Sequence, residues 1–557
     1  MLLDNPLLGP EKLEERAYQV NIAGSCLERS TLVVLPTGMG KTVVALLVIA
    51  EVLNQERGRV LFMAPTKPLV EQHAAFLRQR VEAKIGLMTG EIPPADREWT
   101  WYHEDVIVST PQVVKNDLVH ERASLDDVGL VVFDEAHRAV GNYAYVNVGE
   151  VYKGVHGLVM GLTASPGSDP ERILDVCRNL GIEGVEIRTE YDPDVVNYIH
   201  DVKVEQLRVD MPTSTRRIRD LLKSAFEEVA SKLREKGFLQ ERRRVTIRDI
   251  LAAQKHVQGR LNRGEKNYHL YSAASAVAIA LKINHALQLV ETQGLAALRT
   301  YMGKLEDEAK DEESSKASRM LVKMPKVREA FNLARVTQPE DAKVPRIVEI
   351  LQKQFSSKSD SKVIVFTHYR ETAKLMVEEI DQRPWARPFR FVGQADRGDD
   401  LGLKQREQVE LVEKFKSGEY NVMVATSVAE EGLDIPSTDL VVFYEPIPSE
   451  IRTIQRRGRT GRNQPGRVVV LVTRDSRDEA HLYSAGRKER KMHEELDRLR
   501  EMLKQRILVG MPGGGFFAAP RLSDESSRYL LERGEDEAPR KERAARKQAS
   551  LSDFESA

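Results

Sequence analysis

The pattern of apolar and polar positions changes twice along the chain. Over the first 205 or so residues, short apolar runs alternate with segments of helical periodicity. Strands that alternate with helices are typical of a parallel, doubly wound α/β sheet. The apolar runs that we expect to be strands are Leu32–Leu35, Val60–Ala64, Val106–Thr110, Leu130–Phe133 and Leu158–Leu162.

From about residue 212 to 335 the pattern is helical, with long periodic runs at Ile218–Lys236 and Ala273–Val290. The alternation of strands and helices resumes near Val344. The strands expected there are Val363–Thr367, Val422–Ala425, Leu440–Tyr444 and Val468–Val472. The pattern therefore predicts two RecA-like parallel-sheet domains with an all-helical insert between them.

A charged helix is expected at Glu479–Arg506, and the glycine run Gly513–Gly515 follows it. The last 40 or so residues are charged and poor in apolar side chains, which is typical of disorder. We therefore expect a first α/β domain at 1–208, a helical insert at 209–338, a second α/β domain at 339–510 and a disordered, flexible tail at 511–557.

The overall composition, 41% hydrophobic and 30% charged, is typical of a soluble globular protein. No apolar stretch was expected to approach the roughly 18 residues of a membrane span. No secretory signal is evident at the N-terminus. Only Cys26 and Cys177 are present, which excludes a disulfide framework and fits a reducing interior. We expect a cytoplasmic, nucleoid-associated protein with no membrane partner.

Charge is segregated along the chain although the net charge is −1. Between Met211 and Lys266 there are 15 lysines and arginines against 7 aspartates and glutamates. A segregated basic face is the electrostatic footprint of phosphate-backbone binding. The densest basic run is Arg242, Arg243 and Arg244. A solvated helix face is the alternative.

The segment after the first expected strand has the pattern of a phosphate-binding loop. It reads Pro36-Thr37-Gly38-Met39-Gly40-Lys41-Thr42 and leads into the apolar run Val43–Val52. In such a loop the backbone N–H groups face phosphates, the lysine reaches the β- and γ-phosphates, and the final hydroxyl binds Mg²⁺. Leu35 departs from the general pattern, which has a glycine there. The expected nucleotide-binding residues of this loop are Thr37, Gly38, Gly40, Lys41 and Thr42.

Asp134-Glu135-Ala136-His137 directly follows the expected strand Leu130–Phe133, about 90 residues after the loop. A carboxylate at the end of a parallel strand is where nucleoside triphosphatases with such a loop hold their metal. We expect Asp134 to hold Mg²⁺ through water, and Glu135 to act as the general base that polarises the attacking water. His137 completes the motif.

A third constellation, Gln455–Arg462, reads Q-R-R-G-R-T-G-R. Arginines that complete an active site from another domain stabilise charge on the transferring phosphoryl group. A basic surface loop of a nucleic-acid-binding protein is the alternative.

Together these motifs resemble the superfamily 2 helicases, in their DEAH-box form, from about Arg16 to Arg462. Arg16, Tyr18 and Gln19 look like the family's adenine-reading element. The stretch Ala64–Leu69 looks like motif Ia, and Thr89-Gly90 and Ser109–Gln112 follow it. Thr163–Ser165 looks like motif III, which couples hydrolysis to domain movement, and Ala425–Pro436 looks like motif V.

The resemblance implies that ATP and Mg²⁺ bind between the two α/β domains, with Gln455, Arg459 and Arg462 reaching the nucleotide from the second. It adds Arg16, Gln19, Gly432 and Asp434 to the nucleotide site. It also implies backbone contacts that grip one DNA strand without reading its sequence. The residues implied for that grip are Pro65, Thr66, Lys67, Thr89, Gly90, Thr110, Thr367, Gln394 and Thr426.

Phe391–Gln394, followed by Gly402–Gln408 and combined with a helical insert, is similar to the Hef and Fanconi-anaemia-M branch. This implies an ATP-driven 3′ to 5′ motor on stalled forks and four-way junctions. An RNA-directed helicase of the RIG-I or Dicer type and a non-hydrolysing DNA clamp are the alternatives. Hef proteins often carry a nuclease with an E-R-K-x-x-x-D core. Glu489-Arg490-Lys491 is interpreted as a chance match, because the next aspartate, Asp497, comes two residues too late.

Gln548, Leu551 and Phe554 have the spacing Q-x-x-L-x-x-F, which resembles the peptide that binds the sliding clamp PCNA. A one-turn helix would place Leu551 and Phe554 on one face for an apolar pocket. Many such peptides have a second aromatic where this chain has Glu555, and an accidental match is the alternative.

Overall fold

The computed structural model describes the chain with gaps, and every structural statement below concerns the described residues. These are 2–9, 14–164, 170–189, 192–198, 202–240, 245–265, 267–311, 316–338, 341–394, 402–429, 435–449, 456, 459–460, 465–504, 508–510, 516–518 and 521–522.

The first domain is built on an eight-stranded parallel sheet with strand order β16-β7-β1-β6-β5-β2-β4-β3. All five predicted strands of this half are present. The strands are β1 (Thr31–Val34), β2 (Arg59–Met63), β3 (Ile85–Met88), β4 (Val106–Ser109), β5 (Val128–Phe133), β6 (Leu158–Thr163), β7 (Gly184–Ile187) and β16 (Arg521–Leu522).

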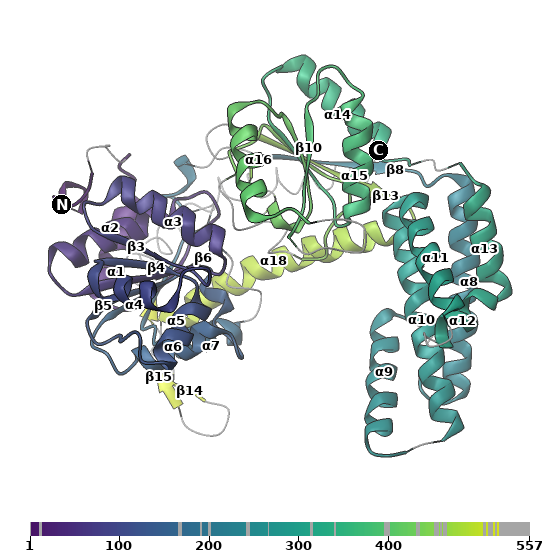
Figure 1. Cartoon of the computed structure of the whole chain (residues 1–557), viewed down its shortest axis with the longest axis horizontal. Coiled ribbons are helices and arrows are strands. Elements are labelled where there is room, and N and C mark those ends of the chain that lie inside the picture. The colour runs from purple at the N-terminus through teal and green to yellow at the C-terminus, as the bar shows by residue number, and fades with distance from the viewer. Residues whose placement is uncertain are drawn as a thin grey trace.

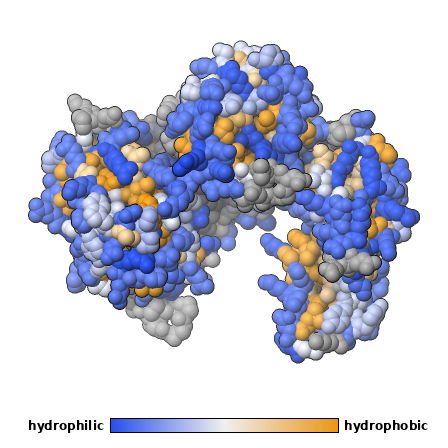
Figure 2. Space-filling view, viewed as in Figure 1, coloured by the Kyte–Doolittle hydropathy of each residue, from blue (hydrophilic) through white to orange (hydrophobic). Residues whose placement is uncertain are grey.

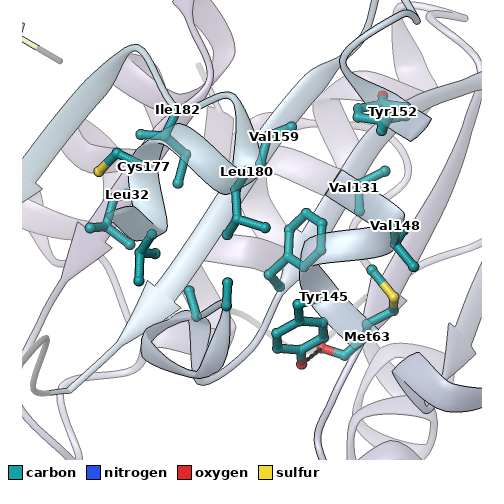
Figure 3. Close-up of a cluster of buried hydrophobic side chains, with 14 of the residues drawn as sticks. Leu32, Met63, Val131, Tyr145, Val148, Tyr152, Val159, Cys177, Leu180 and Ile182 are labelled. Atoms are coloured by element: carbon teal, nitrogen blue, oxygen red, sulfur yellow. Dashed lines mark hydrogen bonds between the residues drawn. The ribbon is translucent and has the colours of Figure 1, made fainter. Parts of the chain in front are cut away.

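Helices cover both faces of this sheet, because successive strand residues point to opposite sides. Val33 packs in the cluster formed with α1 and α2, whereas Leu32 packs with Tyr145 and Leu180 from the opposite layer (Figure 3). The helices are α1 (Ala17–Glu28), α2 (Lys41–Asn54), α3 (Lys67–Arg80), α4 (Pro94–His103), α5 (Pro111–Val119), α6 (Ala144–Tyr152) and α7 (Pro170–Leu180).

The second domain holds a six-stranded parallel sheet of order β10-β11-β9-β12-β13-β8. Helices α14 and α15 pack on one face and α16 on the other. The elements are β8 (Val202–Val209), α14 (Val344–Ser357), β9 (Val363–Phe366), α15 (Arg370–Asp381), β10 (Pro388–Phe391), α16 (Gln405–Ser417), β11 (Val422–Ala425), β12 (Leu440–Phe443) and β13 (Gly466–Thr473).

Strand β8 corrects the expected boundary at residue 208. It lies within the range assigned to the first domain, yet it pairs with β13 from Val202↔Gly466 to Val209↔Thr473 and forms the edge of the second sheet. Its alternating charged residues, Val-Lys-Val-Glu-Gln-Leu-Arg-Val, hid it from a search for continuous apolar runs. The pairing joins segments more than 250 residues apart, so local pattern could not reveal it.

The insert is a helical bundle around α10, which packs against α8, α9, α11 and α12. Thr246 and Asp249 cap α9 reciprocally, and the Asn267 side chain caps α10 by accepting from the Leu270 N–H. Figure 2 shows an apolar band along the lower part of the insert. Ile247 and Leu251 of α9 are exposed apolar residues of this insert. The helices are α8 (Thr213–Glu235), α9 (Ile247–Asn262), α10 (Tyr268–Thr292), α11 (Gly294–Lys310), α12 (Lys316–Lys323) and α13 (Pro325–Val336).

Helix α10 also corrects the expectation about apolar stretches. Among the described helices it alone is long and apolar enough, by length and composition, to cross a membrane. Half of the apolar 18-residue stretch of this helix is buried within the bundle. The core helix of a bundle has this composition because neighbouring helices cover it on several sides.

Helix α18 (Arg477–Lys504) runs from the second domain to the first (Figure 1). Its C-terminal half packs Leu496, Leu499 and Leu503 into the first domain's core, and Arg500 pairs with Asp192 at 2.6 Å. The segment 339–510, which was expected to form the second domain, therefore ends with a helix that packs against the first domain. Beyond it, β14 (Leu508–Gly510) pairs with β15 (Phe516–Ala518), and β16 joins the first sheet. Part of the expected tail thus forms strands; residues 523–557 lie outside the described part.

Candidate active site

The phosphate-binding loop joins β1 to α2 at the carboxyl edge of the first sheet. Gly38 and Gly40 have φ of +85° and +76°, in the left-handed region that favours glycine. A side chain at Gly40 would also collide with Nε2 of Gln19. The N-cap residue of α2 is Gly40, which has no side chain to cap the helix, so the first N–H groups of α2 lie beside the loop without a cap from that residue. The loop is shaped to receive an anion there.

Helix α1 supports this loop from behind. The Met39 carbonyl accepts hydrogen bonds from the Tyr18 hydroxyl (2.8 Å) and from Gln19 Nε2 (3.1 Å). Both side chains are buried. Arg16 lies at the start of the same helix, where its guanidinium stacks over the Tyr198 ring and pairs with Glu14. Of the adenine-reading candidates, Gln19 therefore contacts the loop, and Arg16 lies three residues earlier at the N-cap of the same helix.

Lys41 and Thr37 lie within the loop as predicted. The Lys41 ammonium donates to the Leu35 carbonyl at 3.2 Å. The Thr37 hydroxyl oxygen is buried and has no hydrogen-bond partner in the described part of the chain. A buried hydroxyl normally has a partner, so Thr37 fits a ligand that would supply one. Thr42 follows Lys41 in the first turn of α2.

Asp134 is held from two directions at the end of β5. Its N–H donates to Met63 O at 2.9 Å, and its carbonyl accepts from the Tyr145 hydroxyl at 2.7 Å. Its buried carboxylate accepts from His73 Nε2 at 3.0 Å. Burial opposes ionisation, but the hydrogen bond and charge of His73 and the charge of Lys41 prevail and lower the pKa of Asp134. The carboxylate is thus kept ionised, as a metal anchor must be.

Glu135 and His137 connect this strand end to β6. Glu135 has φ of +50°, a left-handed conformation that is uncommon outside glycine and concentrates at functional sites. His137 Nδ1 lies 3.2 Å from Thr163 Oγ1 and 3.3 Å from Glu135 Oε2. The DEAH segment therefore touches the first residue of the motif expected to couple hydrolysis to domain movement. Ser165 of that motif lies outside the described residues.

The arginine-rich segment is described only in part. Arg459 is buried in the second domain, where its carbonyl accepts from the Thr438 N–H at 2.9 Å. The neighbouring Arg456, for which no role was predicted, is buried, and its guanidinium carbon lies 4.6 Å from the centre of the Phe366 ring. The other predicted nucleotide residues of this domain, Gln455, Arg462, Gly432 and Asp434, lie outside the described residues.

The strand-gripping candidates of the first domain gather at one edge. Pro65, Thr66 and Lys67 follow β2, Thr89 and Gly90 follow β3, and Thr110 follows β4. Thr66 and Thr110 are the N-cap residues of α3 and α5, and neither side chain caps its helix. Two helix N-termini therefore face this edge, where they favour phosphate groups.

The candidates of the second domain behave differently. Gln394 is exposed, but Thr426 and Thr367 are buried. The Thr367 hydroxyl lies 3.4 Å from a Glu445 carboxylate oxygen of its own domain and 3.5 Å from the side-chain oxygen of Gln293, which lies in the insert. Thr367 is therefore a packing residue in this conformation, because its hydroxyl has internal partners. Arg242, Arg243 and Arg244 lie outside the described residues, as do Gln548, Leu551 and Phe554.

Sequence reasoning missed two contacts of α3. His73 binds Asp134 as above, and Glu71 accepts from Gln405 Nε2 of α16 at 2.9 Å, across the two domains. A polar residue on the buried face of a helix is the signal that could have exposed His73. Glu71 carried no such signal.

Three family models match the chain. Residues 16–173 match the DEAD/DEAH box helicase model, 342–464 the helicase conserved C-terminal domain, and 214–341 the helical bundle of a putative ATP-dependent RNA helicase. The crystal structure of the Pyrococcus furiosus Hef helicase domain is 44% identical with a TM-score of 0.66, and the match covers 86% of this chain and all of that one.

The curated relatives include proteins named as helicases and one named after Fanconi anemia group M. The putative ATP-dependent RNA helicase MJ1505 of Methanocaldococcus jannaschii is 39% identical over 91% of this chain. The ATP-dependent DNA helicase mph1 of Neurospora crassa is 33% identical over 83%, and the mouse Fanconi anemia group M protein homolog 30% over 90%. This chain spans 64%, 41% and 27% of their respective lengths.

Proposed function

Because the chain belongs to the superfamily 2 helicases of the Hef and Fanconi anaemia M type, we propose that it is an ATP-dependent motor on forked or branched DNA that acts in repair. The match to the whole Hef helicase domain at 44% identity carries the proposal. The DNA-helicase and Fanconi anaemia M names of the relatives support the substrate class. A 3′ to 5′ direction is part of the proposal.

The residues of the first domain fit ATP and Mg²⁺. The Thr37 hydroxyl, which has no partner among the described residues, and the uncapped start of α2 suit a bound phosphate chain. When bound, Mg²⁺ neutralises charge on the phosphoryl oxygens. Asp134 and Thr42 would hold it.

Each residue then has a chemical task. Lys41 binds β- and γ-phosphate oxygens, which requires it to leave the Leu35 carbonyl. Glu135 accepts a proton from the attacking water, which it also orients. Arg459 and Arg462 stabilise charge at the γ-phosphoryl when the second domain closes on the first.

The strand grip and the domain closure would act together. Thr66, Thr110 and Thr426 contact the backbone of one strand, which positions it without reading its bases. The Gln405–Glu71 hydrogen bond lies between the two α/β domains, so opening and closing would break and remake it. Repeated closure moves the strand by steps.

The described part of the insert has a surface of basic and aromatic residues that would suit the branch point. Lys255, Arg260 and Arg263 line an open hollow of about 490 Å³ near the end of α9. Tyr268 and Tyr271 are exposed at the beginning of α10, Tyr268 to 82%. Cations bind phosphates and exposed aromatic rings stack on unpaired bases, so this surface suits the junction of single and double strands. Arg242–Arg244 would extend it.

An RNA-directed helicase is the second candidate. The helical-bundle model and the relative from Methanocaldococcus jannaschii both carry the words "RNA helicase". A DNA clamp without hydrolysis is disfavoured because Lys41, Asp134 and Glu135 are all present and arranged for chemistry.

ATPase stimulation by nucleic acid tests the choice. Hydrolysis by the full chain would be measured with forked DNA, single-stranded DNA and double-stranded RNA at one salt concentration, with Glu135→Gln as the blank. Forked DNA should stimulate most. Greater stimulation by double-stranded RNA would favour the RNA-directed enzyme, and no hydrolysis above the blank would favour the clamp.

A further inference from the structure

His73 is the side chain through which α3 reaches the metal-anchor candidate. It points from α3 toward the end of β5, and its Nε2 lies 3.0 Å from Asp134 Oδ2. Its ring packs on Phe62 with the ring centroids 4.5 Å apart. Both His73 and Asp134 are more than nine-tenths buried. The contact is therefore shielded from water and fixed in direction.

The chemistry of the contact defines the proton position. An ionised carboxylate only accepts hydrogen bonds, so Nε2 must carry the proton that it donates. Nδ1, the other ring nitrogen, is buried with no hydrogen-bond partner among the described residues. The ring thus makes its side-chain hydrogen bond to Asp134 Oδ2.

The main chain of Asp134 is already held by Met63 and Tyr145 (Figure 3 shows the Tyr145–Met63 bond). What remains free is the rotation of the carboxylate about its side-chain bonds. His73 is the side chain that restricts this rotation, beside a backbone hydrogen bond from Glu135, as the partners of metal-binding residues commonly do.

We propose that His73 is a positioning residue that holds the Asp134 carboxylate in the orientation that binds a divalent cation with nucleotide. The inference rests on the proposed function, because the cation is that of the ATP site. A histidine that only fills the core beside Phe62 would have no effect on cation affinity beyond any effect on folding.

Metal binding can be measured without hydrolysis or DNA. Mn²⁺ would be titrated into the full chain with ADP and followed by electron paramagnetic resonance. His73→Leu removes the donor, and His73→Asn keeps polarity but shortens the reach. His73→Gln places an amide N–H near the position of Nε2. His120→Leu, at an exposed histidine of the same domain, is the matched control.

We expect Mn²⁺ affinity to fall about 10- to 100-fold in His73→Leu and in His73→Asn, with His73→Gln close to wild type. The variants His73→Asn and His73→Gln should agree with each other in ADP affinity, measured in EDTA, to within about twofold. Their melting temperatures should agree to within a few degrees. Unchanged Mn²⁺ affinity in folded His73→Asn would overturn the proposal, and so would equal losses in His73→Gln and His73→Asn. Failure of DNA to stimulate ATPase would refute the proposed function but leave this result standing.

Discussion

Lys343 and Asp478 form an ion pair, 2.6 Å from Nζ to Oδ2, in which both side chains are almost completely buried. Lys343 precedes α14, and Asp478 lies in the first turn of α18. The Lys343 ammonium also donates to the Thr292 carbonyl at the end of α10 and lies over the Tyr444 ring. One buried charge pair therefore joins the insert, the second domain and α18.

Breaking this pair should be costly. Lys343→Met would leave Asp478 buried without its counter-charge and lower the free energy of unfolding by about 3–5 kcal/mol. Urea denaturation would measure it. Arg346→Ala, which removes an exposed pair with Glu349, should cost at most about 1 kcal/mol. Equal, small losses in both variants would contradict the role assigned to the buried pair.

Glu445 should make stability depend on pH. Burial raises the pKa of Glu445 to about 7, although the charges of Lys343 and Arg456 and a hydrogen bond from Gln293 act to lower it; Asp478 adds to the rise. The folded state therefore holds the proton more tightly than the unfolded one. The stability from this group is fully present below the ordinary glutamate pKa and is lost as pH rises toward 7.

Glu445→Gln should remove this dependence. The difference in melting temperature between Glu445→Gln and wild type should grow in favour of the variant from about pH 4.5 to 7, then level off. Glu349→Gln at an exposed site is the control. Parallel pH profiles of wild type and Glu445→Gln would disprove the assignment.

Glu135→Gln should separate ATP binding from hydrolysis. The amide keeps the shape of the side chain but cannot accept the proton of water, so hydrolysis should fall by about two to four powers of ten while ATP affinity stays nearly constant. Lys41→Ala should weaken both, because the ammonium binds phosphate in the ground state as well. Wild-type turnover in Glu135→Gln would show that another group is the base.

Neutralising the insert should weaken binding to branched DNA. Lys255→Ala with Arg263→Ala, and separately alanine at Arg242–Arg244, should lower affinity and flatten its salt dependence, because fewer counterions are released. Basal ATPase should persist. Lys353→Ala, at an exposed lysine of α14, is the matched control. Identical affinities across a salt titration would mean that these residues form only a solvated helix face.

The predicted clamp-binding peptide can be tested apart from the rest of the chain. A peptide of residues 540–557 should bind the PCNA-type clamp of the same organism with micromolar strength, and Phe554→Ala should abolish binding because the apolar plug is lost. Calorimetry would measure both. An absence of heat on mixing the wild-type peptide with the clamp would leave the Q-x-x-L-x-x-F spacing an accident.

Local signals predicted the strands of the first domain from which the candidate site residues follow. The strand expected at Leu32–Leu35 is β1 at Thr31–Val34, and the one expected at Leu130–Phe133 is the end of β5. A glycine at a left-handed turn and an acidic pair after an apolar strand are features that involve only a few consecutive residues. Consecutive residues are what a sequence displays directly, so Lys41, Asp134 and Glu135 could be placed at one sheet edge before any fold was known.

The sequence alone thus determined the two parallel sheets, the helical insert and the phosphate-binding and acidic motifs, because each follows from a short periodic pattern. The tertiary structure decided which sheet takes β8, where α18 ends and that His73 meets Asp134. These contacts join residues 61 to more than 300 positions apart. They are chosen by packing and by the need to pair buried polar groups, and no local pattern encodes which distant partner will satisfy that need.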